Sequence, residues 1–432
     1  MLEKLFKLKE NGTNVRTEIL AGLTTFMTMA YILVVNPSIL SKTGMDFGAV
    51  ITATGFSAIV ATLVMAFWAN LPFALAPGMG LNAFFAFTVC LGLGHPWQFA
   101  LTAVFIEGLI FIVLTLFNIR SAIVNAIPLP LKHAVSCGIG LFIAFIGLVS
   151  AGIVIPAQGI PVTLGDVTSA PVLIALFGLL VGGILLVRKV KGALLVAIVA
   201  STVAALIFRV TQLPENNVFV TMPPSLEPIL FKFTFEHIFT RDMLIIVLTF
   251  LFVDMFDTVG TLVGVASKAD MLDEKGNVPK VKQALFADAI GTTVGACMGT
   301  STVTVYVESA AGVTEGGRTG LTALVVAVLF GVALFFAPVF QMIPGCATAP
   351  VLILVGLFMM SPILKINFND YTESLPCFLT IVMMPFAYSI AEGISFGIVS
   401  YVLLKALSGK YKEVSWLMAI LALLFLIKYA VI

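Results

Sequence analysis

Charged side chains are scarce in this sequence. Asp, Glu, Lys and Arg together make up 10% of the 432 residues, whereas 60% are hydrophobic. A soluble domain uses about 25% charged residues to cover its surface, so a mean hydropathy of +1.13 excludes a soluble globular protein. The composition is typical of a chain that lies mostly in a lipid bilayer. The net charge of +1 gives no reason to expect a nucleic-acid partner.

Cysteine is also rare, and two common enzyme motifs are missing. The five cysteines have no paired spacing, so we interpret them as small, reduced packing residues; they are Cys90, Cys137, Cys297, Cys346 and Cys377. Neither HExxH nor the phosphate-binding GxxxxGKS or GxxxxGKT occurs. The Gly-rich segment 311–318 lacks the lysine of a phosphate-binding loop, and we interpret it as a mobile cytoplasmic turn. We therefore predict no enzyme, no cofactor and no metal site.

Apolar runs divide the chain into fourteen predicted spans, because a bilayer-spanning helix needs about 20 apolar residues. The first seven are 17–36, 49–69, 73–92, 98–117, 131–149, 171–187 and 192–209. The second seven are 242–265, 281–298, 302–313, 319–342, 346–361, 374–389 and 391–406. These spans predict an all-α polytopic membrane protein, with or without a further span at 415–431.

The same runs predict the domain organisation. A cytoplasmic N-terminus (1–16) precedes a first seven-span repeat (17–209). A polar connecting loop (210–241) leads to the second repeat (242–406), and a C-terminal segment (407–432) follows. An odd number of spans in each half requires the second repeat to run inverted relative to the first.

The distribution of basic residues supports this topology. With the N-terminus in the cytoplasm, the cytoplasmic loops hold 18 of the 23 Lys and Arg residues, Arg120 and Lys275 among them. Such an excess is typical of cytoplasmic loops. No cleavable signal with a small-residue site precedes the first span. We therefore expect a multi-pass protein of the cytoplasmic (inner) membrane with its N-terminus inside the cell.

Spans three and ten contain signals that interrupt a helix. Two prolines and two glycines fall within residues 72–80, which is incompatible with a continuous helix. Residues 302–305 alternate Thr and Val, which favours an extended segment. We predict a short strand leading into a half-helix in each span, at an offset of about 230 residues. Interrupted helices at matching positions of inverted repeats point to a binding site near the bilayer midplane.

Three acidic residues lie inside apolar spans and are the main site candidates. Asp254 and Asp257 are three positions apart and share a helix face, while Glu308 lies at the strand-to-helix junction of span ten. A charged group at the bilayer centre costs about 2.5–3.5 kcal/mol on insertion scales, and no Lys or Arg lies at mid-depth in the same spans. Burial favours the protonated form of a carboxyl group. These residues therefore predict a site that takes up a proton, a ligand or both.

Other polar and aromatic residues are weaker candidates. Glu107 is either a structural hydrogen-bonding group or part of a proton route, Asp288 could cap or pair with the broken region, and Glu392 marks a turn. Phe84 and Phe85 could stack on a flat ligand, but among 36 phenylalanines packing is the better interpretation. We interpret the three histidines as incidental residues at span ends: His95, His133 and His237.

Four blocks of the sequence resemble the AzgA-like purine permeases, a branch of the nucleobase–cation symporters. The blocks are EILAGLTTFMTMAYILVVNPSIL, APGMGLNAFFAF, FVDMFDTVGTLVGVA and TSTVTVYVESAAGVTEGGRTGLTA. The resemblance runs from about residue 14 to at least residue 400. It implies a proton symporter for adenine, guanine or hypoxanthine, with fourteen spans in two inverted sevens. It also implies a core domain of spans 1–4 and 8–11, and a gate domain of spans 5–7 and 12–14 that could form a homodimer.

The resemblance also implies roles for individual residues. Glu308 would hydrogen-bond the purine ring, and Asp254 would be its counterpart across the base. Asp257 would support the site or the proton path, and backbone around Gly78 and Ser309 would contribute donors. The wider superfamily tends to have Glu-x-x-x-His or Glu-x-x-x-Asp in span eight, whereas this chain has Asp-x-x-Asp. Which carboxylate binds and which titrates therefore stays open.

Three other functions were weighed against purine import. An anion carrier on the same fold would need a basic residue facing the site, and none lies near spans three or ten. A channel would need rings of polar residues along several helices, and a membrane receptor or scaffold would not explain three intramembrane acids. The sequence therefore predicts a proton-coupled purine importer whose substrate binds between spans three, eight and ten. The resemblance implies an elevator-like movement of core against gate.

Overall fold

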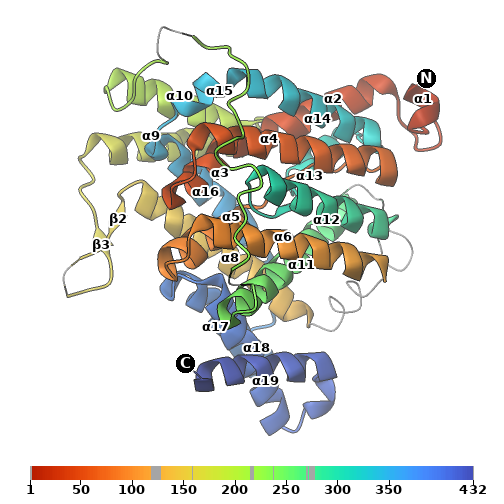
Figure 1. The fold of residues 1–432 in the computed structure, drawn as a ribbon, viewed down its shortest axis with the longest axis vertical. Helices are drawn as coiled ribbons and strands as arrows, with labels where there is room; N and C mark the ends of the chain where they lie inside the picture. The colour runs from red at the N-terminus through yellow and green to blue at the C-terminus, as the bar shows by residue number, and fades with distance from the viewer. Residues whose placement is uncertain are drawn as a thin grey trace.

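The computed structural model of the chain describes residues 2–117, 128–157, 159–214, 218–236, 238–268, 271 and 278–431. Arg120, His237 and Lys275, which the sequence analysis used, lie outside these ranges. Figure 1 shows a bundle of helices through which the chain passes repeatedly from one end to the other. Within the described ranges, nine helices are long and apolar enough to cross a membrane. The predicted polytopic helical fold is thereby confirmed.

The elements of the first half match the first seven predicted spans. They are α1 (Leu2–Leu5), α2 (Val15–Met29), α3 (Ile32–Leu40), η1 (Ser41–Thr43), α4 (Phe47–Val64), η2 (Met65–Ala69), β1 (Leu75–Pro77), α5 (Met79–Ala83), η3 (Phe84–Gly92), α6 (Trp97–Leu116), α8 (Leu129–Ser150), β2 (Val154–Ile155), β3 (Thr163–Leu164), α9 (Ala170–Val187) and α10 (Ala193–Ile207). Strands β2 and β3 form a small hairpin between α8 and α9.

The second half matches the remaining seven. Its elements are α11 (Arg241–Lys268), α12 (Val281–Met298), β4 (Val303–Val305), α13 (Ser309–Thr314), α14 (Gly320–Ala333), η5 (Leu334–Phe336), α15 (Ala337–Gln341), α16 (Gly345–Met359), η6 (Ser361–Lys365), α17 (Tyr371–Phe386), α18 (Ile390–Leu407), η7 (Tyr411–Glu413) and α19 (Trp416–Val431). The C-terminal α19 packs against α18 at the edge of the bundle (Figure 1).

Spans three and ten meet as two paired strands, which confirms the predicted short strands. Strand β1 pairs antiparallel with β4, so that Leu75 lies opposite Val305 and Pro77 opposite Val303. The helices that follow, α5 and α13, begin 230 positions apart, at Met79 and Ser309. Because the strands run antiparallel, the two half-helices leave the pair in opposite directions, as an inverted repeat requires.

Backbone polar groups at this break are hydrogen-bonded within the protein, as non-helical backbone at membrane depth requires. The Gly78 amide donates to the Thr302 carbonyl at 2.9 Å, and the Tyr306 amide donates to the Ala74 carbonyl at 3.0 Å. The Leu75 amide donates to the Thr62 hydroxyl at 3.0 Å. The two broken spans and the Thr62 side chain of α4 therefore satisfy these backbone groups inside the bundle.

The first span is interrupted, although the sequence analysis treated 17–36 as continuous. Helix α2 ends at Met29 and α3 begins at Ile32, with Tyr31 at the junction. The Thr28 hydroxyl donates to the Thr24 carbonyl at 3.2 Å, an i−4 contact of the kind that bends helices. The break contains no proline or glycine, so residue propensities gave no signal for it.

The segment 311–318, interpreted from its glycines as a mobile turn, is tied into the bundle. Residues 309–314 form α13. The buried Glu18 carboxylate accepts the Arg318 amide at 2.9 Å and the Thr322 hydroxyl at 2.6 Å. A carboxylate at the start of α14 satisfies amides that have no partner within the helix, so Glu18 fixes this turn.

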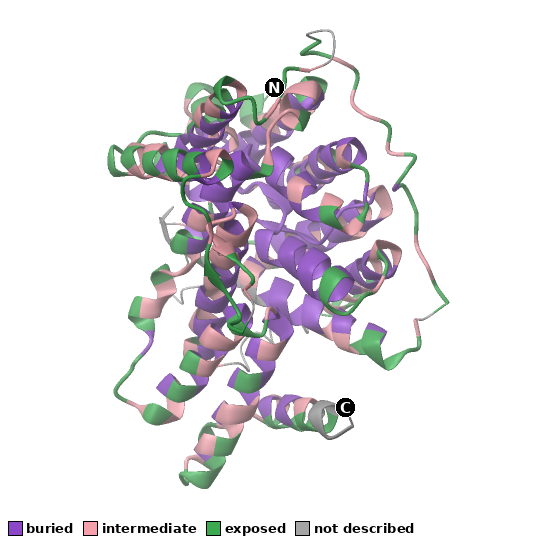
Figure 2. Ribbon diagram, turned by 90° about the vertical axis from the view of Figure 1, so that its left-hand side faces the viewer, coloured by how far each residue is buried: buried purple, intermediate pink, exposed green. Residues whose placement is uncertain are grey.

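The long helices pack in two sets. In one set, α4, α11 and α12 pack against the strand pair, and α6, α14 and α2 pack against these helices and each other. In the other, α8 packs against α16 and α17, with α9, α10 and α18 beside them. Figure 2 shows buried residues running through the middle of the bundle and exposed residues on its outer helices. The division of the chain into core and gate domains itself stays a prediction.

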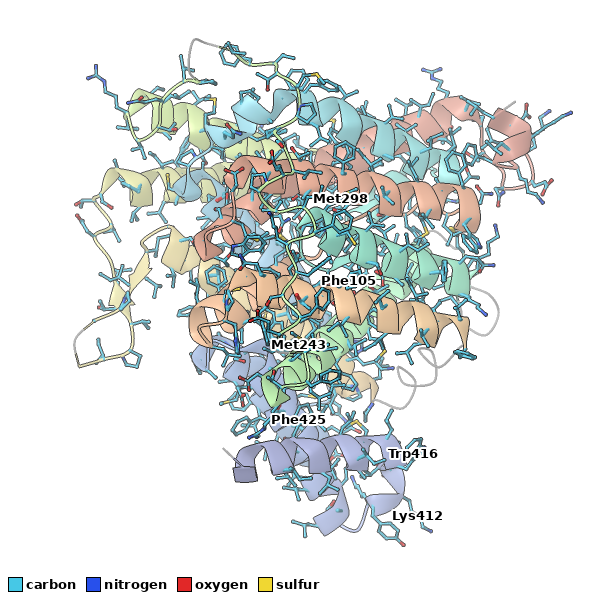
Figure 3. All side chains as sticks on the ribbon, in the orientation of Figure 1. Phe105, Met243, Met298, Lys412, Trp416 and Phe425 are labelled. Carbon is cyan, nitrogen blue, oxygen red and sulfur yellow. The ribbon has the colours of Figure 1, made fainter. Side chains whose placement is uncertain are left out.

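The loop between the two halves crosses the first set of helices along one side of the bundle (Figure 1). The Thr52 hydroxyl donates to the Pro224 carbonyl at 2.9 Å, and the Thr234 amide donates to the Thr102 hydroxyl at 2.9 Å. Phe105, labelled in Figure 3, packs against Phe233 with ring centroids 4.7 Å apart. These contacts reach α4 and α6, so the loop is attached to the first set.

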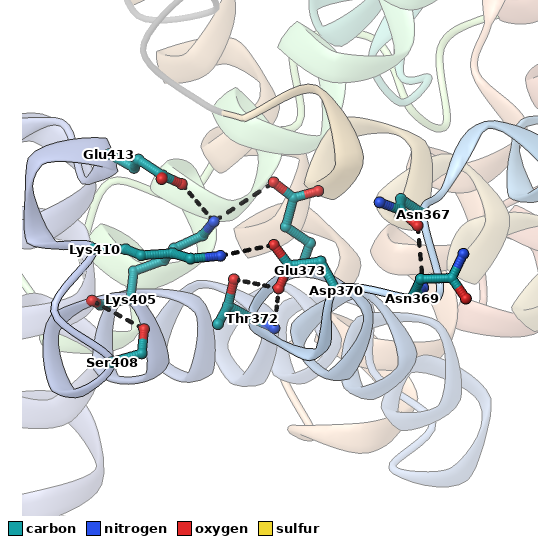
Figure 4. A network of polar contacts seen from close by, with 9 residues as sticks. All are labelled: Asn367, Asn369, Asp370, Thr372, Glu373, Lys405, Ser408, Lys410 and Glu413. Atoms are coloured by element: carbon teal, nitrogen blue, oxygen red, sulfur yellow. Dashed lines mark hydrogen bonds and ion pairs between the residues drawn. The ribbon is translucent and has the colours of Figure 1, made fainter.

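A polar network closes the C-terminal end of the second set (Figure 4). The side chain of Lys405 is 1% exposed, and its Nζ lies 2.5 Å from Glu413 and 3.5 Å from Glu373. Beside it, hydrogen bonds from Lys410 and Thr372 hold the pKa of Asp370 below its usual range. The network joins α17, α18 and η7, which orders the turn that leads to α19.

Candidate functional site

A cavity of about 700 Å³ lies between the two sets of helices. Its volume falls within the range of about 300–1,000 Å³ that ligand sites occupy. The first set lines one wall with Tyr31, Gly78, Met79, Gly80, Asp257, Gly260, Thr261, Gly264, Val265, Thr304, Val305, Tyr306, Val307, Glu308 and Ala310. The second set lines the other with Leu129, Lys132, His133, Val135, Ser136, Ile139, Val355, Phe358, Met359, Ser361, Pro362 and Lys365. The strand-to-helix junctions of both repeats therefore reach the same space.

Glu308 lies at the start of α13 and faces this cavity. The Tyr31 hydroxyl donates to Glu308 Oε1 at 2.6 Å. Tyr31 reaches the carboxylate because the break between α2 and α3 brings it to the cavity wall. The bond holds one carboxylate oxygen in place, and the group can accept further hydrogen bonds from a ligand.

Asp257 and Gly78 lie next to each other on the same wall. A Cβ atom added at Gly78 would lie 3.7 Å from Asp257 Oδ2 and only 2.6 Å from Thr304 Cγ2. Any side chain at position 78 would therefore displace β4 or fill the space between Asp257 and Thr304. Glycine keeps this space open, so a ligand could reach the Asp257 carboxylate.

Asp254 faces away from the cavity, towards α12. It is fully buried, and the Thr258 hydroxyl lies 3.0 Å from its Oδ1. The same hydroxyl lies 2.9 Å from Asp288 Oδ1 and 2.7 Å from the Thr304 hydroxyl. The structure thus brings Asp257 and Glu308 together at the cavity, while the Thr258 hydroxyl links Asp254 to Asp288. Thr258 and Thr304 connect the two groups.

The hydroxyl and the amide of Ser309 both form hydrogen bonds within the protein. Its hydroxyl accepts the Ala74 amide at 3.0 Å, and its own amide donates to the Tyr306 carbonyl at 3.1 Å. Ser309 therefore fixes the start of α13 beside β1 and does not line the cavity, whereas Met79 and Gly80 at the start of α5 do.

The weaker candidates have structural partners. Glu107 accepts the Thr302 hydroxyl at 2.6 Å and so joins α6 to the broken span. Glu392 lies in the first turn of α18, where its amide meets the Ser389 hydroxyl. Phe84 is buried and packs edge-to-face on Phe250, in agreement with the packing interpretation.

His95 and His133, interpreted from the sequence as incidental residues at span ends, both have specific surroundings in the structure. His95 lies 3.3 Å from Asp242 and stacks on Phe99. His133 lines the cavity together with Lys132 and Lys365. The sequence around spans three and ten gives no sign of this basic group, because the group belongs to α8 and η6 and reaches the cavity only through packing.

A GxSxG pattern occurs at residues 393–397 but does not form a nucleophile site. It lies inside α18, where the Ser395 hydroxyl donates to the Ala391 carbonyl at 2.8 Å. A serine nucleophile of this motif requires a strand-to-helix turn that exposes its hydroxyl. Ser395 is buried in a regular helix instead.

The two helix sets touch at the end of α8 opposite the cavity mouth. Lys42 Nζ lies 3.0 Å from the Ser150 hydroxyl and 5.1 Å from the centre of the Phe87 ring. Phe87 in turn packs edge-to-face on Tyr388. Lys132 and Ser150 are about 27 Å apart along α8, at 1.5 Å per residue. The cavity lining therefore extends to one end of the bundle, at Lys132. The contacts of Lys42 and Phe87 between the two helix sets lie at the opposite end.

Comparisons with known proteins agree on the family and the fold. A model described as the permease family matches residues 16–396. A putative permease of Methanocaldococcus jannaschii is 49% identical over 99% of this chain and 98% of that protein. The adenine permease AdeP of Escherichia coli is 43% identical over 99% of this chain and 96% of its own. The guanine/hypoxanthine permease PbuO of Bacillus subtilis is 44% identical over 98% of this chain and 99% of its own.

A solved structure shares the fold at low sequence identity. The transmembrane domain of the cyanobacterium bicarbonate transporter BicA matches with a TM-score of 0.65 at 17% identity, covering 88% of this chain and 97% of that chain. The likeness extends over both halves of the sequence, so the two inverted repeats form one architecture.

Proposed function

Because this chain belongs to the permease family, we propose that it imports purine nucleobases across the cytoplasmic membrane together with protons. The observation that carries the proposal is the cavity at the strand pair, which both Glu308 and Asp257 line. The ring and exocyclic N–H groups of adenine, guanine and hypoxanthine are donors, and carboxylates accept such bonds. The permeases that resemble this chain over nearly their whole length are named for these same bases.

The base would bind with its polar edges on the first helix set and one face on the second. Glu308, oriented by Tyr31, and Asp257 would accept hydrogen bonds, and the space above Gly78 would admit the ring. Ile139, Val355 and Phe358 offer an apolar surface on the opposite wall. Asp257 thus takes the place of Asp254 as the proposed partner of Glu308, because only Asp257 lines the cavity. Asp254 and Ser309 would support the site.

The coupled proton would reside on the group formed by Asp254 and Asp288. A hydroxyl has one hydrogen to donate, yet the Thr258 hydroxyl lies within 3.0 Å of oxygens on both aspartates. A proton on one of them supplies the missing hydrogen. Thr304 would connect this proton to the cavity and to Asp257.

Transport would proceed by movement of the first helix set against the second. Loss of charge at the site carboxylates lowers the cost of carrying them through the apolar interface. Coupling requires that only the carrier loaded with both base and proton, and the empty carrier that has released both, move between the two sides of the membrane. The cavity mouth lies at the end that holds Lys132 and Lys365, and the excess of basic residues makes this the cytoplasmic end. The structure is then inward-open, and a homodimer through the gate helices stays a prediction.

The test is uptake of labelled hypoxanthine, guanine and adenine into cells that lack their own purine carriers. Wild type, Glu308→Gln and the control Glu315→Gln would be compared with and without a protonophore. Uptake that collapses with protonophore and is lost only in Glu308→Gln supports the proposal. The absence of purine uptake by a well-expressed protein would overturn the substrate. Normal uptake by Glu308→Gln would exclude the start of α13 from the base site. Uptake of bicarbonate or sulfate in place of purines would favour an anion carrier.

Thr258→Val is expected to separate proton coupling from base binding. Valine keeps the shape but removes the hydroxyl that joins Asp254, Asp288 and Thr304. Accumulation driven by a pH gradient should fall about tenfold or more, because a hydrogen bond to a charged group contributes about 1.5–3 kcal/mol. Exchange of labelled for unlabelled base at equal pH should persist, and Thr258→Ser should restore accumulation. An equal loss of both activities would contradict the proton group.

Cross-linking position 42 to position 150 is expected to trap the carrier with its cavity open to the cytoplasm. A Lys42→Cys/Ser150→Cys variant, in a background without the five native cysteines, would be treated with a short bifunctional thiol reagent. Uptake should be lost after cross-linking, while each single-cysteine variant is unaffected by the reagent. Unchanged uptake by a fully cross-linked protein would exclude movement between these ends of the two helix sets.

A further inference from the structure

We propose that the cytoplasmic half of the cavity binds the phosphate of a purine nucleoside monophosphate, whose base occupies the Glu308–Asp257 site. Such a nucleotide would act as an inhibitor from inside the cell. The proposal rests on the base site described above and adds to it a second, anion-binding part.

The two walls of the cavity carry opposite charge. Both acidic lining residues, Asp257 and Glu308, belong to the first helix set. All three basic lining residues, Lys132, His133 and Lys365, belong to the second. Lys132 and His133 lie in the first two turns of α8, and Lys365 ends the η6 turn. Lys132 and Lys365 are close enough to His133 to interact with it electrostatically.

The basic group has no ion-pair partner in the part of the chain that the structure describes. None of the ion pairs found there includes Lys132 or Lys365. Lys132 and His133 are partly buried, and Lys365 is exposed. Like charges that converge on one space repel each other, and an anion bound between them removes this repulsion. The geometry therefore favours a dianionic group at the mouth.

The size of the cavity points to an occupant larger than a base. A purine base has about ten heavy atoms, whereas a cavity of about 700 Å³ is of the size that holds drug-sized ligands. A nucleoside monophosphate carries a base at one end and a phosphate at the other, separated by a ribose. It would place hydrogen-bond donors on Glu308 and Asp257 and its phosphate on the lysines.

A ligand held by polar or charged contacts on both walls would resist their relative movement, whereas the base alone meets the second set only through an apolar surface. The base contacts the first helix set and the phosphate contacts the second, so the nucleotide would link the two bodies that must move past each other. It would enter at the mouth, because Lys42, Phe87 and Tyr388 join the two sets at the other end. A nucleoside monophosphate is what forms when a phosphoribosyl group is transferred to an imported base, so a product made from the base would restrain further uptake.

The experiment is displacement of a labelled purine base from the purified full-length carrier in detergent, where both ends of the protein are accessible. The competitors are the monophosphate of that base, the corresponding nucleoside and inorganic phosphate. The proteins are wild type, Lys132→Gln/Lys365→Gln, and the control Lys4→Gln/Lys412→Gln, which removes two exposed lysines (Lys412 is labelled in Figure 3). Each competitor is scored against the affinity of the same variant for the base, which corrects for any change in the base site.

For wild type and the control variant, the monophosphate should displace the base about tenfold better than the nucleoside, because charge-assisted bonds to phosphate are strong. In Lys132→Gln/Lys365→Gln this advantage should disappear. Equal displacement by nucleoside and monophosphate in wild type would overturn the inference, as would an advantage retained in the lysine variant. Displacement of the base by inorganic phosphate as effectively as by the monophosphate would indicate a general anion site. That result would also overturn the inference. Failure of the labelled base to bind at all would instead overturn the proposed function.

Discussion

Asp257→Ala is expected to weaken purine binding by about 10- to 150-fold. The Asp257 carboxylate faces the cavity beside Gly78, and a hydrogen bond to a charged group contributes about 1.5–3 kcal/mol, with 1.4 kcal/mol for each tenfold change in Kd. The measurement is equilibrium binding of labelled base to purified protein, followed by uptake in cells without other purine carriers. Uptake at low substrate concentration should fall by the same factor.

Asp254→Ala is the matched control, since it removes an identical side chain three residues away on the same helix. Asp254 contacts the Thr258 hydroxyl and does not line the cavity. Its substitution should change the Kd for the base by less than about threefold while abolishing accumulation against a gradient. If Asp254→Ala lost base binding and Asp257→Ala kept it, the proposed roles of the two aspartates would be exchanged.

Gly78→Val is expected to abolish both base binding and uptake. A Cβ at this position would lie 2.6 Å from Thr304 Cγ2, which is closer than two carbon atoms approach without overlap. The two Cγ atoms of valine would also fill the space in front of Asp257. The expected result is loss of measurable binding by a protein that still inserts in the membrane and purifies as a single species.

Gly183→Val is the matched control for Gly78→Val. Gly183 lies in α9, and a Cβ added there would meet nothing within 4 Å. Binding and uptake should stay within about twofold of wild type. Gly78→Ala tests the same space with a smaller side chain, and its effect should be intermediate. Normal binding by Gly78→Val would exclude this junction from the base site.

The roles of Asp254 and Asp257 illustrate where sequence reasoning stops. Residues three apart on a helix are neighbours on its surface, so the sequence predicted that both face one site. Helix α11, however, passes along the boundary between the cavity and α12. A rotation of about 60° between the two side chains, from 3.6 residues per turn, is enough to place one in the cavity and the other against Asp288. Only the packing of neighbouring helices decides such a difference.

The sequence by itself determined that the chain spans a membrane, because apolar length and scarce charge leave no other solvent for it. It also determined the fourteen spans and the two interruptions, since proline, glycine and alternating β-branched residues act locally on the backbone. Glu308 could be selected because a carboxylate inside an apolar span is costly wherever the span lies.

The tertiary structure decided which residues share the cavity. Tyr31 reaches Glu308 through a helix break without proline or glycine, and Lys132 and Lys365 converge from segments more than 200 positions apart. Glu18 holds the turn before α14 across 300 positions. These contacts depend on how helices from the two halves pack against each other. The sequence of one helix fixes which residues lie on each of its faces, but it does not fix which neighbouring helix those residues meet. The partners of a side chain are therefore a property of the assembled fold.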